Sequence, residues 1–421
     1  MRRVAAAVVL ACALSTAAAD KLTLEQALAS VAAAHPDRRI AESDLDIARA
    51  ERALADSQQD FALYLDGNLR RGRRPDDGWK PDNALRIVAR KPLLDFGRSS
   101  GAVDAAEQEI VARQAALINV ENLRRIDVMA RYFDVLLADM RYAADNEFMA
   151  VAFVSLENAR DRLDVGQIGQ PELMRREAEF QDLRERRNAS LQRLRATRQA
   201  LAHAINRPGE LPVELVEPAL EDNGRPVAAY ETLLAAALKN NPRMRVLTAQ
   251  LAAVDARIAA VRADRRPMLA AEVVGADYSR ESTTRDDVSA GLVFSVPLYQ
   301  GGRIDAREAR ERAAGTRLRA ELDKLRFDLA EALLATRQEI EWLRDSGRPA
   351  ADTQIEFRDW ALERARAEYE LELRTNLGNS MAETQTALLR RKQVEYRLAL
   401  ALARLEALSG GRLPPVEGAA Q

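Results

Sequence analysis

The stretch VPLYQGGR, Val296 to Arg303, decides how the chain is organised, because an earlier stretch repeats it. The earlier stretch is KPLLDFGR, Lys91 to Arg98. Four residues recur at an offset of 205: Pro92, Leu93, Gly97 and Arg98 match Pro297, Leu298, Gly302 and Arg303. In both places a segment with strand-like alternation precedes the stretch and a long helical segment follows it. The sequence therefore predicts a tandem duplication.

Each copy contains two segments with the alternation of β-strands, directly before its repeated stretch. In the last of them, apolar residues alternate with mostly small or polar ones: Val288, Ala290, Leu292, Phe294 and Val296 against Ser289, Gly291, Val293 and Ser295. A period of two is typical of a strand with one apolar face. Two such strands joined by a polar turn predict β-hairpins at about 61–92 and about 268–297.

The segment after the first stretch predicts a very long helix. Between Ser99 and about Val165 there is no proline and only one glycine, Gly101. A helix of about 65 residues rises about 100 Å at 1.5 Å per residue. A return helix from Pro171 to about Asn206 would lie antiparallel to it. Helices of this length form coiled-coil arms and not the wall of a compact globule.

The second copy predicts the same plan with one interruption. Helical arms are expected at 304–346 and about 351–408. Between them Gly347-Arg348-Pro349 breaks the pattern, because proline removes a backbone donor from a helix interior. The corresponding residues of the first copy, 141–143, include neither glycine nor proline.

Shorter helices are expected to begin before each hairpin. Thr23-Leu24-Glu25-Gln26 is a capping box. His35-Pro36 matches Asn241-Pro242 in the second copy, and proline suits the first turn of a helix. His35-Pro36-Asp37 also matches a tripeptide of J-domain co-chaperones, but its counterpart keeps only the proline. We therefore interpret both dipeptides as helix starts.

The first 19 residues have the pattern of an export signal. Arg2 and Arg3 precede a short apolar run, Val4 to Leu14, and Ala17-Ala18-Ala19 provides a small-residue cleavage site. A run of about 11 apolar residues is too short for a retained membrane helix, which needs about 20. An alternative is a lipoprotein signal in which Cys12 is lipidated, although Cys12 lies inside the apolar run and would leave it unusually short.

Composition excludes several classes of function. The chain has 63 basic and 65 acidic residues, a balance without a nucleic-acid signature. Its one cysteine lies in the signal, so the exported chain would contain no disulfide. With only two histidines, His35 and His203, a histidine metal site or a catalytic triad has little to build on. We predict no enzymatic activity, no cofactor and no metal.

The strands determine the architecture that we expect. Strands of about ten residues with one apolar and one polar face are what a membrane β-barrel requires. Four strands cannot close a barrel, and open strand edges are not tolerated in lipid. Several chains must therefore contribute to one barrel. The fold class is mixed membrane α+β, with the strands in a barrel shared between chains and the helices in long antiparallel coiled-coil arms.

The expected parts follow the duplication. They are a signal peptide at 1–19, a first repeat at 20–206 with its helical hairpin at about 99–206, a linker at 207–227, a second repeat at 228–409 with its helical hairpin at about 304–408, and a tail at 410–421.

The two-copy plan, the repeated stretches and the turn Arg-Leu-Asp-Val-Gly at Arg162 to Gly166 resemble the TolC family of outer-membrane efflux proteins. The resemblance covers nearly all of the chain after the signal. It implies a homotrimer whose 12-stranded barrel lies in outer-membrane lipid and continues into a helical tunnel in the periplasm. It also implies a periplasmic adaptor (membrane fusion) protein and an inner-membrane pump as partners. The protein would be a passive exit duct of a tripartite efflux or type I secretion system.

The resemblance also assigns roles to residues. Those that would join the barrel to the tunnel are Pro92, Gly97, Arg98, Pro297, Gly302 and Arg303. The turns that would contact the adaptor contain Val165, Gly166, Gln167, Glu372, Leu373 and Thr375. Glu172, Tyr369 and Arg374 would hold the periplasmic gate closed, because a carboxylate can accept hydrogen bonds from both a phenol and a guanidinium.

The second turn departs from the family pattern, and the function has alternatives. Glu372 stands where a glycine is expected, and residues 377–381 contain no acidic side chain. A periplasmic coiled-coil scaffold without transport would leave the four alternating strands unexplained. An exit duct for secreted protein would differ in its cargo, about which the wall of a conduit says little.

Overall fold

The computed structural model describes residues 21–32, 35–74, 78–209, 214–280, 285–371 and 377–414, so the expected signal lies outside it. The chain forms two compact units, and each draws on both halves of the sequence. Unit 1 contains the described residues of 1–33, 124–225 and 340–401, and unit 2 those of 34–123, 226–339 and 402–421. Three helices contribute to both units: α3 (Arg98–Asp164), α7 (Arg303–Trp342) and α9 (Leu377–Leu408).

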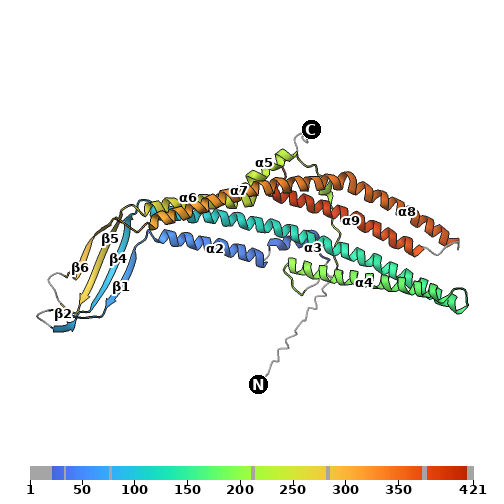
Figure 1. The fold of residues 1–421 in the computed structure, drawn as a ribbon, viewed down its shortest axis with the longest axis horizontal. Helices are drawn as coiled ribbons and strands as arrows, with labels where there is room; N and C mark the ends of the chain where they lie inside the picture. Colours follow the sequence, from blue (N-terminus) through green and yellow to red (C-terminus); the bar gives the residue numbers. More distant parts are fainter. Residues whose placement is uncertain are drawn as a thin grey trace, which may run out of the picture. The chain divides into compact units, whose positions relative to one another are not determined.

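Both expected β-hairpins are present in unit 2 and form one antiparallel sheet. Its strands are β1 (Ala62–Asn68), β4 (Ala84–Leu94), β5 (Met268–Tyr278) and β6 (Val288–Ser295), in the order β1-β4-β5-β6 (Figure 1). Because β4 pairs with β5, the two hairpins lie side by side. The sheet has two outer strands, β1 and β6, and each has a partner on one side only within the described chain.

The turn expected between the first two strands contains a further small hairpin. Strands β2 (Arg71–Arg74) and β3 (Gly78–Pro81) pair antiparallel. The last pair of β1 and β4 is Asn68 with Ala84, and the first pair of β2 and β3 is Arg71 with Pro81. Three residues separate these pairs on each side of the hairpin, so the small hairpin continues the register of the large one.

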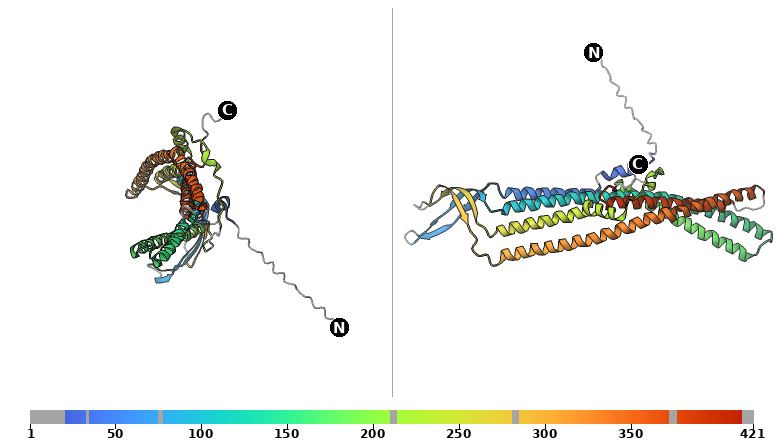
Figure 2. Two further views of the ribbon diagram at one scale, coloured as in Figure 1. Left: turned by 90° about the vertical axis from the view of Figure 1, so that its right-hand side faces the viewer. Right: turned by 90° about the horizontal axis from the view of Figure 1, so that it is seen from above.

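The helices of unit 2 form a layer in which α2 (Pro36–Ser57), the first part of α3, α6 (Pro242–Ala263) and α7 lie side by side (Figure 2). Gly101 of α3 allows close packing, since a Cβ there would lie 3.0 Å from the Cβ of Ala260 on α6. Arg262 of α6 donates to Glu308 of α7 at 2.7 Å. The shorter α5 (Tyr230–Asn240) precedes α6.

Unit 1 is built from two helical hairpins. The second part of α3 returns through α4 (Gln170–Ala204), and α8 (Arg348–Glu370) is followed by α9; the short elements are α1 (Leu24–Ala29), η1 (Ser30–Ala32) and η2 (Glu221–Gly224). The buried core of the unit is aromatic. Tyr396 of α9 stacks on Phe133 of α3 at 4.4 Å between ring centroids. The hydroxyl of Tyr132 donates to the carbonyl of Leu22 at 2.8 Å.

The expected helix starts and the first helical turn are confirmed. Thr23 and Gln26 form the capping box of α1. The ring nitrogen Nδ1 of His35 accepts from the amide of Asp37, and the side chain of Asn241 accepts from the amide of Arg243. At the end of α3, Gly166 has φ +73°, and the amide of Gln167 donates to the carbonyl of Arg162. This is the Schellman arrangement, in which a left-handed glycine stops a helix.

The expected interruption at Gly347-Arg348-Pro349 is wrong, because the chain stays helical through it. Residues Leu343–Gly347 form a π-helical turn, η3, which joins α7 to α8. The amide of Arg348 donates to the carbonyl of Leu343, five residues back. The wider turn fits one extra residue before Pro349, which then stands in the first turn of α8, where its missing donor is tolerated.

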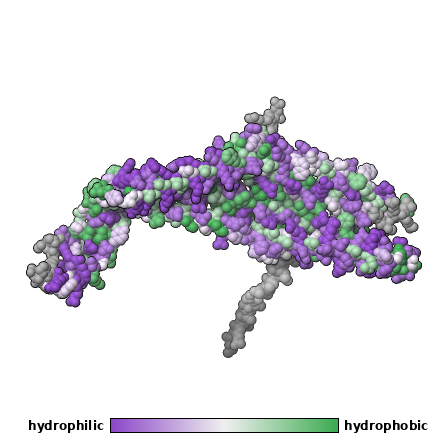
Figure 3. Space-filling model, in the orientation of Figure 1, coloured by the Kyte–Doolittle hydropathy of each residue, from purple (hydrophilic) through white to green (hydrophobic). Residues whose placement is uncertain are grey.

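Hydrophobic residues gather where the strands meet the helices of unit 2, and the opposite end of the sheet, around β2, is hydrophilic (Figure 3). Exposed apolar side chains at the helical end include Leu93, Leu94 and Leu298. None of the helices in the described part of the chain combines the length and the apolar character needed to cross a membrane.

Candidate functional site

The pairing register gives the sheet one apolar and one polar face. Directly opposed residues of neighbouring strands share a face. The face that we call the apolar face carries Leu63, Leu65, Gly67, Leu85, Ile87, Ala89, Leu269, Ala271, Val273, Val288, Ala290, Leu292 and Phe294. Two charged residues on this face, Lys91 and Asp277, stand near its two ends. The apolar face predicted from the last strand therefore extends across all four strands.

The polar face carries charges that pair with each other. Arg90 and Glu272 lie opposite one another on β4 and β5 and form an ion pair at 3.2 Å. Asp66 and Arg86 are opposed on β1 and β4. Ser289 and Ser295 of β6 lie on this face as well. Such a face suits contact with water.

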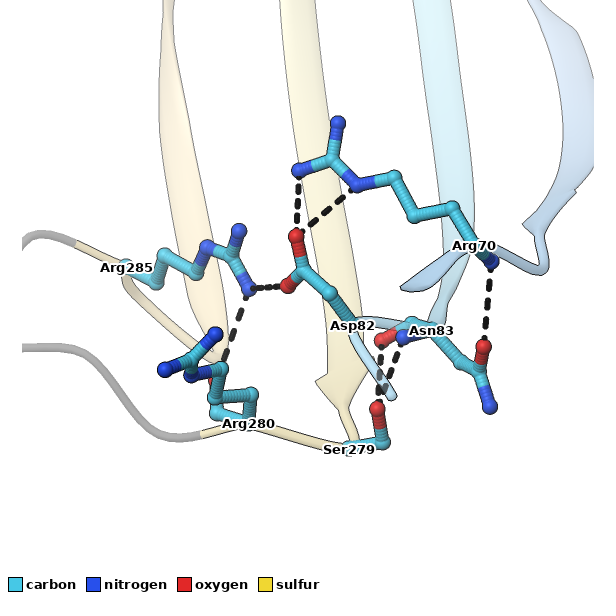
Figure 4. Close-up of polar contacts among 6 residues, drawn as sticks. All are labelled: Arg70, Asp82, Asn83, Ser279, Arg280 and Arg285. Atoms are coloured by element: carbon cyan, nitrogen blue, oxygen red, sulfur yellow. Dashed lines mark hydrogen bonds and ion pairs between the residues drawn. The ribbon is translucent and has the colours of Figure 1, made fainter. Parts of the chain in front are cut away.

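An ionic cluster around Asp82 holds the turns together at the hydrophilic end of the sheet (Figure 4). The carboxylate of Asp82 lies 2.6 Å from Arg70 and 2.9 Å from Arg285. The hydrogen bond from Arg285, followed by that from Arg70, holds the pKa of Asp82 below its usual value despite desolvation. Ser279 donates to the carbonyl of Asn83 and accepts from its amide. Segments more than 190 residues apart in sequence are thereby joined.

The first repeated stretch turns the chain from β4 into α3. Asp95 accepts from the amide of Ser99 at 2.8 Å and so caps the first turn of the helix. Burial alone would raise the pKa of Asp95, but the bonds from Ser99 and Gly97 lower it overall. Gly97 has φ +95°, a conformation that favours glycine. Arg98 pairs with Asp264 at 2.7 Å, which ties α3 to the segment after α6.

The second stretch makes an equivalent turn from β6 into α7. Gly301 and Gly302 have φ of +60° and +74°. Arg303 donates to the side chain of Gln300, so the two arginines, 98 and 303, have different partners. Glu308, one turn into α7, is buried and binds Arg262 and Arg312, each at 2.7 Å. The bond from Arg262 is the largest of the effects that lower the pKa of Glu308.

Two of the candidate gate residues are described, Glu172 in the first turn of α4 and Tyr369 near the end of α8, both in unit 1. Glu172 receives two hydrogen bonds from Arg175 and one from Arg176, all within α4. The bond from Arg175 is the main reason that the pKa of Glu172 is lowered. Tyr369, near the end of α8, is 54% exposed. Arg374 lies outside the described residues, so only two of the three candidates are placed.

The candidate adaptor contacts are placed only in the first turn. Val165, Gly166 and Gln167 are exposed around the Schellman arrangement that ends α3. Glu372, Leu373 and Thr375 lie outside the described residues. Within the described ranges, no group of three or more His, Cys, Asp or Glu side chains could hold a metal ion.

Solved structures of outer-membrane proteins are similar in fold to this chain. No family model matches the chain. The CmeC outer membrane channel of Campylobacter jejuni superposes with a TM-score of 0.75 at 12% identity, covering 92% of this chain and 85% of that one. VceC, an outer membrane protein of Vibrio cholerae, gives 0.72 at 16% identity, covering 93% and 97%. The chain has the fold of the TolC family of outer-membrane channels.

A sequence relative points the same way. Outer membrane efflux protein BepC of Brucella suis is 25% identical over 287 residues, which are 66% of this chain and 61% of that protein. The chain thus matches about three fifths of the length of this curated relative. The TolC-family resemblance read from the repeated stretches is confirmed.

A network in unit 1 of this TolC-like chain was missed by sequence reasoning. Arg348, just after the π-helical turn, donates two hydrogen bonds to Glu395 of α9, at 2.8 and 2.9 Å. Asn223 donates to the same carboxylate at 2.7 Å, and Arg344 donates to the carbonyl of Asn223. The only sequence signal was the unusual Gly-Arg-Pro run. It indicates where the network lies but not which residues bind Arg348.

This network predicts a dependence of stability on pH. Desolvation raises the pKa of Glu395, but the bonds from Arg348 and Asn223 outweigh it and leave the pKa lowered. A carboxylate whose pKa is lower in the folded state stabilises the protein above its unfolded pKa, and this stability is lost as the pH falls through the folded value. The unmutated protein should therefore lose more stability than Glu395→Gln between about pH 5 and pH 3. Thermal unfolding across that range measures it, and parallel curves would contradict the prediction.

Proposed function

We propose that three copies of this chain form an exit duct in the outer membrane, which passively conducts substrates from an inner-membrane pump to the exterior. The apolar face of the sheet carries this proposal. It continues over four strands, and its large side chains on the two outer strands are exposed in the single chain, Leu292 to 67% and Leu65 to 67%. An apolar face of this kind suits contact with lipid, while the polar face suits a water-filled lumen.

The unpaired edges of the sheet support assembly from several chains. β1 and β6 each leave one edge open within the described chain. Open edges are not tolerated in lipid, so β1 of one copy would pair with β6 of the next. Three copies of four strands would give a 12-stranded barrel, within the usual range for outer-membrane proteins. The two repeated stretches would then carry each hairpin into the helices of the tunnel.

Assembly is tested by fractionation and gel mobility. We expect the protein in the outer-membrane fraction as a trimer that becomes a monomer on boiling. The barrel is complete only between chains, so the trimer should resist mild detergent. A soluble monomer after mild extraction would refute the architecture and favour a periplasmic scaffold without transport.

Partners follow from the same proposal. BepC is described as an efflux protein, and a conduit of this type would work with a periplasmic adaptor and an inner-membrane pump. The exposed turn at Val165 to Gln167, together with residues 372–375, would meet the adaptor. Co-purification of a cross-linked adaptor from the native cell, lost when Gly166 is replaced by a bulky residue, would support this contact.

The gate should close through the turn between α3 and α4 and through residues 369–374. A link between Glu172 and both Tyr369 and Arg374 of a neighbouring hairpin would hold the turns together through charge-assisted hydrogen bonds. Arg374→Ser combined with Tyr369→Phe should therefore raise single-channel conductance in planar bilayers while trimer yield stays unchanged. The pairing of Glu172 with Arg175 inside α4 competes with this link. An unchanged conductance would leave closure to apolar packing.

A further inference from the structure

The small hairpin β2–β3 has two faces that continue those of the sheet. Its register follows on from β1 and β4, so odd-numbered residues keep to the side of the apolar face. Arg73 pairs with Trp79, and Arg71 pairs with Pro81, all on that side. Gly72 lies on the other side, where a Cβ would be 3.5 Å from the carboxylate of Asp82.

The base of this hairpin is fixed. The amide of Asp82 donates to the carbonyl of Arg70 at 2.8 Å, and the amide of Arg70 donates to the side chain of Asn83 at 3.2 Å. Both flanking guanidiniums, Arg70 and Arg285, are engaged with Asp82. Arg70 and Arg285 thus share one carboxylate on the side of the polar face, which we call the inner side; the side of the apolar face is the outer side.

Two arginines on the outer side are exposed and have no counter-charge among the described residues. Arg71 and Arg73 form neither an ion pair nor a side-chain hydrogen bond there, and both are solvent-exposed. Trp79 is 66% exposed beside Arg73. Leu69, which closes the apolar face just before the hairpin, is 88% exposed. Arg71 is only two residues beyond Leu69, about 7 Å along an extended chain.

We propose that Arg71, Arg73 and Trp79 bind the phosphorylated headgroups of lipids in the outer leaflet. This inference rests on the proposed function, because it takes the apolar face to be the lipid-facing one. Guanidinium groups bind phosphate oxygens through paired hydrogen bonds. A tryptophan at the level of the headgroups anchors a protein in the membrane interface. The position of the three side chains, just beyond the last leucine of an apolar face, meets both requirements and favours lipid phosphate over a soluble anion.

The test uses the purified full-length protein in neutral detergent micelles. It is titrated with diphosphoryl lipid A and, separately, with the same lipid lacking its phosphates. We expect the phosphorylated lipid to bind about tenfold more tightly or better, and this preference to weaken as salt rises. In a variant that retains Trp79 as its sole tryptophan, made by Trp342→Phe and Trp360→Phe, the fluorescence should shift to the blue only with the phosphorylated lipid.

Three double variants separate charge from fold. Arg71→Gln with Arg73→Gln should abolish the preference, and Arg71→Lys with Arg73→Lys should keep part of it. Arg243→Gln with Arg245→Gln, a matched pair of exposed arginines on α6, should keep all of it. Equal binding of both lipids by the unmutated protein, or a preference that survives the first variant, would overturn this inference alone. Failure of the fractionation experiment would instead remove the proposed function.

Discussion

Leu292→Arg should abolish trimer assembly, whereas Ser289→Arg should not. Leu292 lies opposite Ala271 of β5, midway along the outer strand β6 on the apolar face, and it is 67% exposed in the single chain. An arginine facing lipid near the midplane of a barrel costs about 2–4 kcal/mol. Each of three chains would bear this cost, so the total is comparable with the whole stability of a typical domain.

Ser289 provides the matched control on the same strand. It lies opposite Val274 on the polar face, where a guanidinium would remain in water. Ser289→Arg should therefore form the heat-sensitive trimer at normal yield and change conductance, since three arginines would enter the lumen. Both variants are compared as unboiled samples of the outer-membrane fraction on gels. If Leu292→Arg assembled and Ser289→Arg did not, the two faces would have been assigned the wrong way round.

The faces of the sheet could be predicted from the sequence because strand alternation is local. In β6, every second residue from Val288 to Phe294 is apolar, and this fixes the face without knowledge of any neighbour. The pairing of β4 with β5, in contrast, joins residues about 180 positions apart. No local pattern specifies that contact, and only the structure shows it.

The turns at the hydrophilic end were predicted less completely for the same reason. A polar turn was expected between the first two strands, and it contains the hairpin β2–β3. The Gly78-Trp79 pair and the run of arginines in it resemble loop composition more than strand composition. Asp82 binds Arg285, which lies 203 residues away in the sequence. A local pattern of residues cannot predict so distant a partner.

The local ion pairs of Glu172 at the candidate gate could have been predicted from the sequence. Glu172 stands three and four residues before Arg175 and Arg176, the spacing at which side chains of one helix meet. The family resemblance implied partners on another hairpin instead. Links between hairpins remain a prediction, and the local pairs are what the single chain forms.

The end of α9 is held by a packing contact that only glycine permits. Gly410 has φ +91° and follows a buried Ser409. The amide of Gly411 donates to the carbonyl of Glu406 and that of Gly410 to Ala407, which is again the Schellman arrangement. A Cβ on Gly410 would lie 2.5 Å from the Cβ of Asn240 and 2.7 Å from its backbone carbonyl. Next to it, the side chain of Asn241 donates to the carbonyl of Leu408 at 3.0 Å.

Gly410→Ala should therefore destabilise unit 2 far more than Gly411→Ala. Both glycines have positive φ, so each alanine bears a backbone strain of about 1–2 kcal/mol. Only at position 410 does the new methyl group also meet fixed backbone, which adds about 1–3 kcal/mol because the α9 end must move away from α5. At Gly411 there is nothing within 4 Å of the added atom.

Thermal unfolding, followed by circular dichroism on the detergent-purified protein, measures this difference. The unmutated chain should be the most stable, Gly411→Ala less stable and Gly410→Ala the least stable. Equal losses in the two variants would mean that strain alone acts and that α9 does not dock against Asn240 in the assembled protein.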